Sequence, residues 1–365
     1  MSRRRRVTES VDPSEQHSKA DTNPLSRTET ALSPFKNALV NGGVPPSEAI
    51  TAVAPYLNIF GKTFIPETDI PDLTGKVILV TGGNTGIGKE TVLQLAKHSP
   101  SCIYLAARNA TKAEAAIREI KGIVSDARVE YLELDLSSCA SVKRAAGEFL
   151  RKERRLDILI NNAGVMGLPA TETPEGYDIQ FGTNHIGHHL LTKLLIPTLL
   201  ETAEQPDSKP KGVRVVNVSS SAHAVAPPGG IVFDNINLER ANALTRYGQS
   251  KLANILDTRE LARRYPGITS VAVHPGVILT HLYDAICGWG PVFRYGVALF
   301  GRLFMQNVVQ GALNQLWAAT SDEVENGSYY HPVGSKSMGN AYARDEELAR
   351  KLWDWTEAEL NKHGY

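Results

Sequence analysis

The segment Val77-Ile78-Leu79-Val80-Thr81-Gly82-Gly83-Asn84-Thr85-Gly86-Ile87-Gly88 decides the fold of this chain. Its first four residues are β-branched or leucine, a composition typical of a strand that is buried on both faces. Spaced glycines follow, and residues 89–96 then begin a helical pattern. A strand, a glycine-rich turn and a helix in this order predict a cradle for the pyrophosphate of a dinucleotide, because the helix N-terminus offers unpaired N–H groups. The alternative interpretation is an ordinary turn that is rich in glycine.

Each spaced glycine of this turn has an expected task. Gly82 lets the chain turn sharply, Gly86 leaves room for a phosphate, and Gly88 lets helix and strand pack closely. The coenzyme-binding residues expected in the turn are Gly82, Asn84, Thr85, Gly86, Ile87 and Gly88.

Length and composition fit one large domain with a tail. The chain has 365 residues, of which 42% are hydrophobic and 21% are charged, so it can bury a core and hold one domain of about 290 residues. Its formal net charge is zero, which gives no electrostatic attraction for nucleic acid, so no partner of that class is expected. Cys102, Cys139 and Cys287 lack the spacing of zinc or redox motifs, which favours reduced thiols and a cytoplasmic protein.

The first 35 residues differ in composition from the rest. A basic run, Arg3 to Arg6, is followed by polar residues and prolines with little apolar surface, so we expect residues 1–35 to be a disordered tail. No apolar stretch follows the arginines, which disfavours a secretory signal and leaves a nuclear or organellar address open. Residues 36–70 mix apolar residues with prolines and are expected to form an extension packed on the main domain, residues 71–365.

Strand and helix patterns alternate downstream of the glycine turn. Further strands are expected at 102–107, 129–134, 156–160, 213–218 and 269–274, with helices around 111–121, 138–152, 175–203 and 243–265. This alternation predicts an α/β fold, a Rossmann-type doubly wound parallel sheet in three α/β/α layers. Ligands of such sheets bind beyond the carboxyl ends of the strands, where the motifs of this chain cluster.

Tyr247 and Lys251 carry the expected chemistry. Residues four positions apart share one face of a helix, so the Lys251 ammonium can lie near the Tyr247 phenol and favour its ionised form. The phenol then becomes an acid–base group that works near neutral pH. A surface pair on an amphipathic helix is the alternative, and the glycine turn upstream argues against it.

These motifs together resemble the short-chain dehydrogenase/reductase family. The matching features, in order and spacing, are the TGxxxGxG turn at 81–88, Asp135-Leu136, Asn161-Asn162-Ala163-Gly164, Asn184, Ser220, Tyr247 with Lys251, and Pro275-Gly276. The resemblance covers the chain from about Asp69 to its C-terminus. Within the family, residues 72–76, 107–109 and 343–348 are similar to the retinol-dehydrogenase-like branch, especially its fungal members.

The resemblance implies roles for four catalytic residues. Tyr247 would exchange a proton with the substrate oxygen while hydride moves between nicotinamide and carbon, and Ser220 would hydrogen-bond the same oxygen. Lys251 would support the ionised Tyr247 and hold the nicotinamide ribose, and Asn184 would position a water that links Lys251 to solvent. Strand-end spacing favours Ser220, and the serines on either side of it, at 219 and 221, remain alternatives.

Further coenzyme contacts follow from the same resemblance. Asp135 would contact the edge of the adenine, and Asn161 and Gly164 would border the adenine side. The contacts expected beyond the glycine turn are Arg108, Asp135, Leu136, Asn161, Ala163, Gly164, Tyr247, Lys251, Pro275, Gly276, Val277 and Thr280.

The residue after the second strand predicts which coenzyme is preferred. A carboxylate at this point accepts hydrogen bonds from the free 2′-hydroxyl of NAD, whereas this chain has Arg108, whose guanidinium can pair with the 2′-phosphate of NADP. Asn109 and Thr111 can add hydrogen bonds. We therefore expect NADP(H) to be the cofactor; the alternative is that Arg108 points to solvent.

Two conspicuous stretches lie outside these motifs. His185, His188 and His189 fall close together without the spacing of a complete metal site, so no metal is expected. The stretch 281–313 interleaves aromatic residues with glycines and arginines, and none of its apolar runs is long enough to cross a bilayer. We expect this stretch to form an apolar pocket wall or lid; core packing and peripheral membrane contact are the alternatives.

The sequence thus favours an NADP-dependent oxidoreductase that interconverts an apolar alcohol and its aldehyde or ketone. The alternative is an NADP(H)-sensing regulator that keeps the fold without turnover. The four intact catalytic positions favour the enzyme, because a regulator needs no poised acid–base tyrosine beside a lysine. Leu190-Leu191 and residues 194–196 suit a helix packed on the sheet or on a second subunit, so a homo-oligomer stays open.

Overall fold

The computed structural model describes residues 61–208, 212–276 and 308–365. The predicted tail, residues 1–35, lies outside the described residues, as does most of the 36–70 extension. The predicted coenzyme contacts Val277 and Thr280 and most of the predicted lid also lie outside them.

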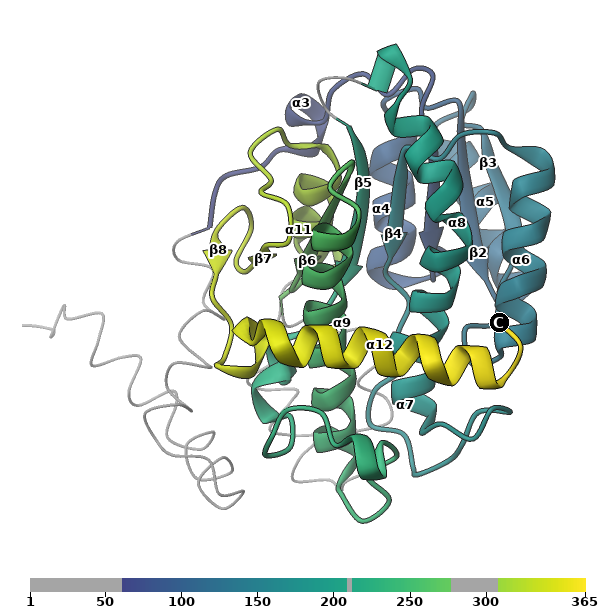
Figure 1. Ribbon diagram of the computed structural model, residues 1–365. Coiled ribbons are helices and arrows are strands. Elements are labelled where there is room, and N and C mark those ends of the chain that lie inside the picture. Colours follow the sequence, from purple (N-terminus) through teal and green to yellow (C-terminus); the bar gives the residue numbers. More distant parts are fainter. Residues whose placement is uncertain (1–60, 209–211, 277–307) are drawn as a thin grey trace, which may run out of the picture. The chain divides into compact units, whose positions relative to one another are not determined.

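The described residues form one sheet of eight strands in the order β3-β2-β1-β4-β5-β6-β7-β8 (Figure 1). The strands are β1 (Val77–Thr81), β2 (Cys102–Ala107), β3 (Val129–Glu133), β4 (Ile158–Asn161), β5 (Val213–Val218), β6 (Ile268–Val273), β7 (Tyr329–Tyr330) and β8 (Lys336–Ser337). All neighbours pair in parallel except β7 and β8. The strand order reverses at β1, which places a ligand crevice beyond its carboxyl end, where the glycine turn lies. The predicted doubly wound sheet is confirmed.

Helices cover both faces of this sheet. One face packs against α4 (Gly86–Ala96), α5 (Ala110–Ile123) and α11 (Val308–Thr320). The other packs against α6 (Cys139–Lys152), α8 (Gly187–Ala203) and α9 (Ala243–Arg264), and α12 (Glu346–Lys362) adds apolar residues to the same core. Every residue of β1, β2, β4 and β5 is buried, because helices shield both sides of these strands. The three-layer α/β/α architecture follows, and α12 crosses α8 and α9 on their outer side (Figure 1).

The long helix expected at 175–203 begins later and is interrupted. The Asp178 carboxylate accepts the N–H groups of Gln180 and Phe181, which starts the short helix α7 (Ile179–Phe181). A π-turn, Gly182–Ile186, follows, and α8 then continues the helix. Apolar periodicity shows neither the capping residue nor the π-turn, so the predicted start at residue 175 was wrong.

Two predicted segments are partly described. Of the 36–70 extension, the described part includes the one-turn helix α3 (Pro66–Asp69), and Phe64 and Ile70 beside it are buried in the core under α4. Of the 281–313 stretch, residues 308–313 are the start of α11, and Ala312 packs in the same core. This end of the stretch therefore serves core packing.

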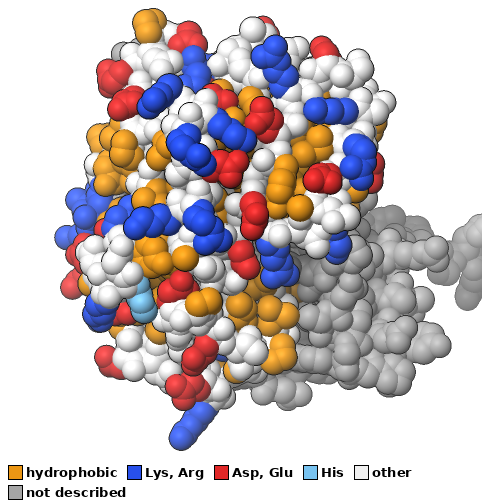
Figure 2. Space-filling model, turned by 90° about the vertical axis from the view of Figure 1, so that its right-hand side faces the viewer, with side chains coloured by type: hydrophobic (Ala, Val, Ile, Leu, Met, Phe, Trp, Pro, Cys, Tyr) orange, Lys and Arg blue, Asp and Glu red, His pale blue; other side chains and the backbone are white. Residues whose placement is uncertain are grey.

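The surface carries both signs of charge. Figure 2 shows Lys and Arg side chains interspersed with Asp and Glu over the face in view, without a region of one sign. This agrees with the formal net charge of zero. Among the helices that the structure describes, none has the length and apolar composition needed to span a membrane.

Candidate active site

The glycine turn has the backbone geometry expected of it. Gly82 and Gly86 have φ angles of +67° and +54°, a region that residues with a side chain rarely adopt. A Cβ atom at Gly88 would lie 2.3 Å from the carbonyl oxygen of Gly82, so only glycine lets α4 pack this closely on the turn. The turn therefore brings the N-terminus of α4 to the carboxyl end of β1.

The N-terminus of α4 suits an anion. Thr85 is the N-cap in an extended conformation, and its side chain makes no capping hydrogen bond. The first turn of α4 contains no acidic residue. N–H groups at such a helix start, together with the helix dipole, favour a phosphate. A dinucleotide pyrophosphate fits the residues present.

The loop after β4 is tied to this turn through Thr81. Its hydroxyl oxygen accepts the N–H groups of Asn162 at 2.9 Å and Ala163 at 3.0 Å, and the Asn162 amide donates to the Thr81 carbonyl at 2.8 Å. The Asn161 side chain is buried, where it donates to Thr192 Oγ1 of α8 and Asn217 Oδ1 of β5. A contact of Asn161 with a coenzyme, which stays a prediction, is thus left to its main chain.

The residues predicted for the adenosine half lie at the ends of β2 and β3. Arg108 directly follows β2, is exposed, and forms no ion pair with another residue of the described ranges. The Asn109 side chain caps α5 by accepting the N–H of Lys112. Asp135 accepts hydrogen bonds from the N–H and hydroxyl of Ser137, which holds its carboxylate at the strand end.

Tyr247 and Lys251 lie together near the start of α9, and both are buried. The Lys251 ammonium nitrogen is 5.7 Å from the centroid of the Tyr247 ring and donates to the Val218 carbonyl at 2.9 Å. Burial lowers the pKa of Lys251 to about 7. The lysine therefore changes its charge near neutral pH, in contact range of the tyrosine.

The serine segment after β5 packs directly on α9. A Cβ at Gly248 would lie 2.7 Å from the Ala222 carbonyl oxygen, so the glycine after Tyr247 admits the 3₁₀ turn Ser221–Val225. The Ser219 hydroxyl is buried and donates to the Lys251 carbonyl at 2.7 Å. Ser220 is half-buried, and its hydroxyl oxygen accepts the Ala222 N–H at 3.1 Å. The engagement of Ser219 in packing supports Ser220 as the substrate-facing serine.

Asn184 lies in the π-turn and is fully buried. Its side chain accepts the Val165 N–H at 2.8 Å and donates to the Val165 carbonyl and to Ser250 Oγ. At Gly164, a Cβ would lie 3.3 Å from Asn184 Oδ1 and 3.4 Å from Lys251 Nζ. Asn184, Gly164 and Lys251 thus meet at one point, and the predicted water at Asn184 stays a prediction.

Thr81, Gly248 and His188 make contacts in the site that the sequence motifs did not predict. A glycine inside a helix costs stability relative to alanine, so Gly248 beside Tyr247 was a usable signal of close packing. His188 contacts Thr81, while His185 contacts Thr356 and His189 contacts two carboxylates. The three histidines point to different partners, and the described part of the chain contains no cluster that could hold a metal.

The motif at the end of β6 also reaches the carboxyl edge. Pro275 and Gly276 are half-buried there, directly after His274, whose N–H donates to the Tyr330 carbonyl at 3.1 Å. The predicted residues on β1, β4, β5, β6 and α9 therefore converge on one edge of the sheet.

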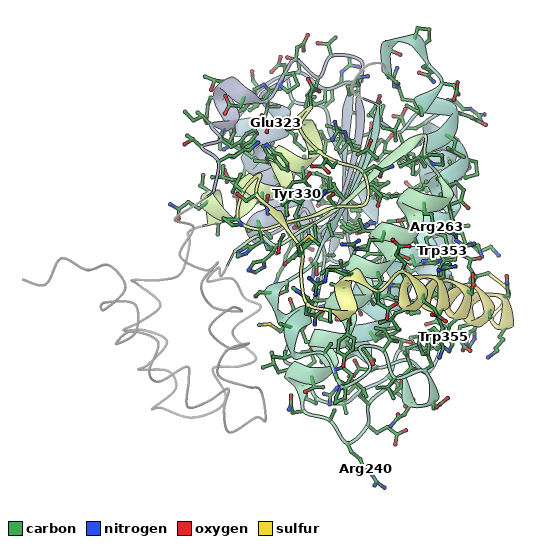
Figure 3. All side chains as sticks on the ribbon, turned by 60° about the vertical axis from the view of Figure 1, so that its left-hand side comes forward. Arg240, Arg263, Glu323, Tyr330, Trp353 and Trp355 are labelled. Atoms are coloured by element: carbon green, nitrogen blue, oxygen red, sulfur yellow. The ribbon has the colours of Figure 1, made fainter. Side chains whose placement is uncertain are left out.

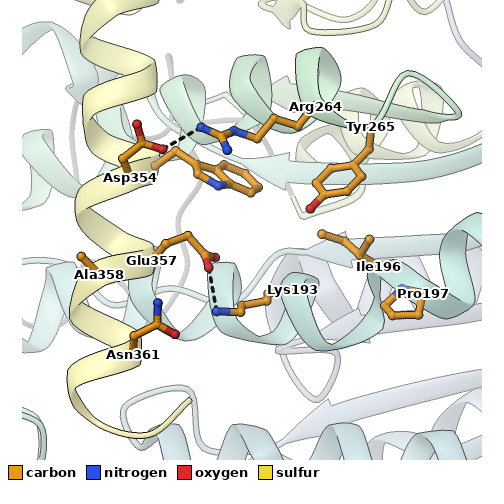
Figure 4. Close-up of a pocket in the computed structure, with 10 residues that line it drawn as sticks. Lys193, Ile196, Pro197, Arg264, Tyr265, Asp354, Glu357, Ala358 and Asn361 are labelled. Atoms are coloured by element: carbon orange, nitrogen blue, oxygen red, sulfur yellow. Dashed lines mark hydrogen bonds and ion pairs between the residues drawn. The ribbon is translucent and has the colours of Figure 1, made fainter.

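A groove between α8, α9 and α12 is separate from this site (Figure 4). Trp353 lines it, and the neighbouring Trp355 also comes from α12 (Figure 3). Its charged rim is paired, Lys193 with Glu357 and Arg264 with Asp354, each at 2.7 Å. Because the groove contains none of the predicted catalytic or coenzyme-binding residues, we do not place the substrate in it.

Comparisons with known proteins agree with this geometry. Residues 76–287 match the sequence model of the short chain dehydrogenase family. A short-chain dehydrogenase/reductase of Aspergillus calidoustus is 41% identical over 311 residues, which cover 80% of this chain and 96% of that protein. Retinol dehydrogenase 11 of Homo sapiens is 40% identical over 292 residues, 79% of this chain and 86% of that protein.

Solved structures share the fold. The structure of an uncharacterized protein from Mycobacterium paratuberculosis aligns with a TM-score of 0.64 at 31% identity, covering 82% of this chain and 97% of that one. A short chain dehydrogenase of Shigella flexneri complexed with NADP aligns with a TM-score of 0.54 at 21% identity, covering 71% and 97%. By its motifs, its fold and these relatives, the chain belongs to the short-chain dehydrogenase/reductase family and is retinol-dehydrogenase-like.

Proposed function

We propose that this chain is an NADP(H)-dependent oxidoreductase that interconverts an apolar alcohol and its aldehyde or ketone. One observation carries the proposal: a buried lysine lies 5.7 Å from the ring of Tyr247, on the helix that packs against the serine segment after β5, at the sheet edge that also holds the glycine turn. Burial destabilises the charged form of Lys251. A protein that only sensed a coenzyme would have no use for such a lysine beside a phenol.

The chain's residues divide the acid–base work. Tyr247 donates a proton to the substrate oxygen during reduction and takes it back during oxidation. Ser220 donates a hydrogen bond to the same oxygen and so fixes its position. Lys251 in its charged form favours the tyrosinate, and its pKa of about 7 lets the pair exchange protons near neutral pH. Bound NADP(H) supplies or accepts the hydride.

The residues that would hold the coenzyme fit its chemistry. The N-terminus of α4 offers N–H groups to the pyrophosphate, with no acidic residue in the first turn to repel it. Asp135 and Leu136 stand at the predicted adenine side, and Lys251 is within reach of a ribose hydroxyl in the family's arrangement. The NADP found in the Shigella flexneri structure agrees with this assignment.

The first test measures turnover. Purified protein is mixed with NADPH and a panel of lipophilic aldehydes, ketones and retinaldehyde, the last because several relatives are named retinol dehydrogenases. Wild type should consume NADPH with at least one member, and Tyr247→Phe should lose about 10²–10⁴-fold in kcat while it binds NADPH normally. NADPH binding without any turnover would favour the regulator instead.

The second test concerns the coenzyme preference. Arg108 is exposed at the end of β2, where its guanidinium can pair with a 2′-phosphate. Charge-assisted hydrogen bonds of about 1.5–3 kcal/mol correspond to a roughly ten- to hundredfold preference for NADP(H). Arg108→Asp should reverse this preference and leave turnover with saturating coenzyme largely intact. Equal dissociation constants in wild type, or a variant that still prefers NADPH, would reject Arg108 as the determinant.

A further inference from the structure

His188 links two parts of the candidate site that are far apart in the sequence. It is the second residue of α8 and is buried, with 4% of its surface exposed. Its Nε2 atom lies 2.9 Å from Thr81 Oγ1 at the end of β1, and its Nδ1 atom lies 3.0 Å from the Asn184 carbonyl oxygen in the π-turn. One side chain thus bridges the glycine turn and the turn that carries Asn184.

The partners fix the direction of every hydrogen bond in this bridge. A carbonyl oxygen only accepts, so His188 Nδ1 carries the hydrogen that is donated to Asn184. Thr81 Oγ1 already accepts two N–H groups, from Asn162 and Ala163, and has one hydrogen of its own to donate. His188 Nε2 is the acceptor at 2.9 Å, whereas the Ile160 carbonyl is 3.5 Å away. The neutral Nδ1–H tautomer therefore pairs both imidazole nitrogens of His188, the Asn184 carbonyl and the Thr81 hydroxyl.

The π-turn changes the backbone hydrogen bonding directly before His188. Within Gly182–Ile186 the backbone bonds skip one residue, and the Gly187 N–H reaches the Gly182 carbonyl five positions back. Such a turn disturbs the regular pairing of helix carbonyls, and buried carbonyls require donors. The imidazole supplies one to Asn184 without adding a charge, since burial lowers the pKa of His188 to about 4.

We propose that His188 is a positioning residue that locks the coenzyme-binding turn to the Asn184 turn. The hydrogen-bond chain runs from the N–H groups of Asn162 and Ala163 through Thr81 and His188 to the Asn184 carbonyl. His188 itself touches neither reacting atoms nor coenzyme in this assignment. The inference rests on the proposed function, because it gives the two turns their coenzyme-binding and catalytic meaning.

Two substitutions each keep half of the bridge. In His188→Asn the amide nitrogen can take the place of Nδ1 and still donate to Asn184, while the acceptor for Thr81 is lost. In His188→Gln the amide oxygen can take the place of Nε2 and still accept from Thr81, while the donor to Asn184 is lost. A histidine that only filled space would make the two variants equivalent in function, apart from a common loss of stability.

The test separates coenzyme affinity from turnover. His188→Asn should weaken NADPH binding by about tenfold and change kcat at saturating coenzyme by less than about threefold. His188→Gln should keep the NADPH dissociation constant within about threefold, lower kcat by about tenfold and shift the pH profile of kcat. The matched control is His185→Asn, whose shorter side chain loses the Nε2 bond to Thr356 on α12 and should lower stability alone. Parallel losses of affinity and kcat in both variants, in step with their melting temperatures, would overturn the proposal.

Thr81 provides a second route should the histidine variants fold poorly. Thr81→Ser keeps the hydroxyl and should bind NADPH like wild type, whereas Thr81→Val also loses the acceptor for Asn162 and Ala163 and should weaken binding at least as much as His188→Asn. Combining Thr81→Val with His188→Asn should weaken binding no further than Thr81→Val alone, since Thr81→Val already removes the link to His188. Additive losses would contradict the link.

Hydrogen exchange measures the same bridge without a substrate. Amide exchange should quicken around residues 162–165 in His188→Asn and around residues 182–188 in His188→Gln. This outcome can hold even when wild type reduces no carbonyl compound, in which case the proposed activity fails and the bridge stands. Unchanged exchange in both segments would reject the bridge while leaving the proposed activity untouched.

Discussion

Two neighbouring histidines are buried on opposite faces of α8, and their pKa values shift in opposite directions. On the inner face, His188 sits among a hydroxyl and a carbonyl, and burial lowers its pKa to about 4. On the outer face, burial alone would lower the pKa of His189, but the carboxylates of Asp257 and Glu357, at 2.6 and 2.9 Å, raise it to about 9. Burial decides the charge of a histidine only where no carboxylate faces it.

The outer face uses its charges to hold the last helix. His189 on α8 lies between Asp257 of α9 and Glu357 of α12, and Lys193 pairs with the same Glu357 at 2.7 Å. The Trp353 ring of α12 packs edge-on against His189 with centroids 4.6 Å apart. The inner face thus orients groups of the candidate site through neutral, directional bonds, and the outer face joins three helices through ion pairs around the buried His189.

The largest expected effect comes from breaking the outer face. Asp257→Asn removes one carboxylate from a buried pair and leaves His189 partly uncompensated, which should cost about 3–5 kcal/mol of unfolding free energy. NADPH affinity should be unchanged, because the Asp257 carboxylate contacts His189 of α8 and none of the predicted coenzyme-binding residues in the described ranges. Urea unfolding and fluorescence titration measure the two quantities.

An exposed ion pair between α9 and α12 provides the control. Arg264 of α9 and Asp354 of α12 are 2.7 Å apart, and the Asp354 side chain is 68% exposed. Asp354→Asn should cost less than about 1 kcal/mol, because solvent screens the pair. Equal losses of unfolding free energy in Asp257→Asn and Asp354→Asn would show that the buried pair stabilises the fold no more than the exposed one.

The next effect is a pH dependence with a defined sign. His189 has a folded pKa of about 9 against an ordinary value of 6.5, so its stabilisation is complete below pH 6.5 and is lost as pH rises through 9. Lys251 acts in the opposite sense, since its folded pKa of about 7 lies below the ordinary 10.5 and stability rises with pH between these values.

Subtracting the curve of His189→Gln from that of wild type isolates the histidine. The difference in unfolding free energy should shrink by about 2–3 kcal/mol between pH 6.5 and 9.5. Urea unfolding at five or six pH values is sufficient to measure it. A difference that stays constant with pH would mean that His189 is neutral when folded.

The features that the sequence could predict are those whose interacting residues are close together in the chain. The strands, the glycine turn and the Tyr247–Lys251 face depend on residues that are close in sequence, so periodicity and spacing were sufficient. The His189 cluster depends on partners 68 and 168 positions away, and no local pattern marks such pairs. The π-turn inserts one extra residue into an otherwise regular helix. This insertion leaves the apolar pattern of residues 179–203 almost unchanged.

The smallest expected effect is the uptake of a proton by Lys251 when NADPH binds. It distinguishes the candidate site from the His189 cluster on the outer face of α8. At pH 8 most of Lys251 is neutral, because burial lowers its pKa to about 7. The phosphates of NADPH bring negative charge to the site and favour the ammonium, so binding should take up as much as about 0.9 proton per site. Calorimetric titrations at pH 8 in buffers of different ionisation enthalpy measure this number directly. Lys251→Met should abolish the uptake, and His189→Gln on the opposite face of α8 should leave it unchanged. Binding without uptake in wild type, or uptake that persists in Lys251→Met, would place the titrating group elsewhere.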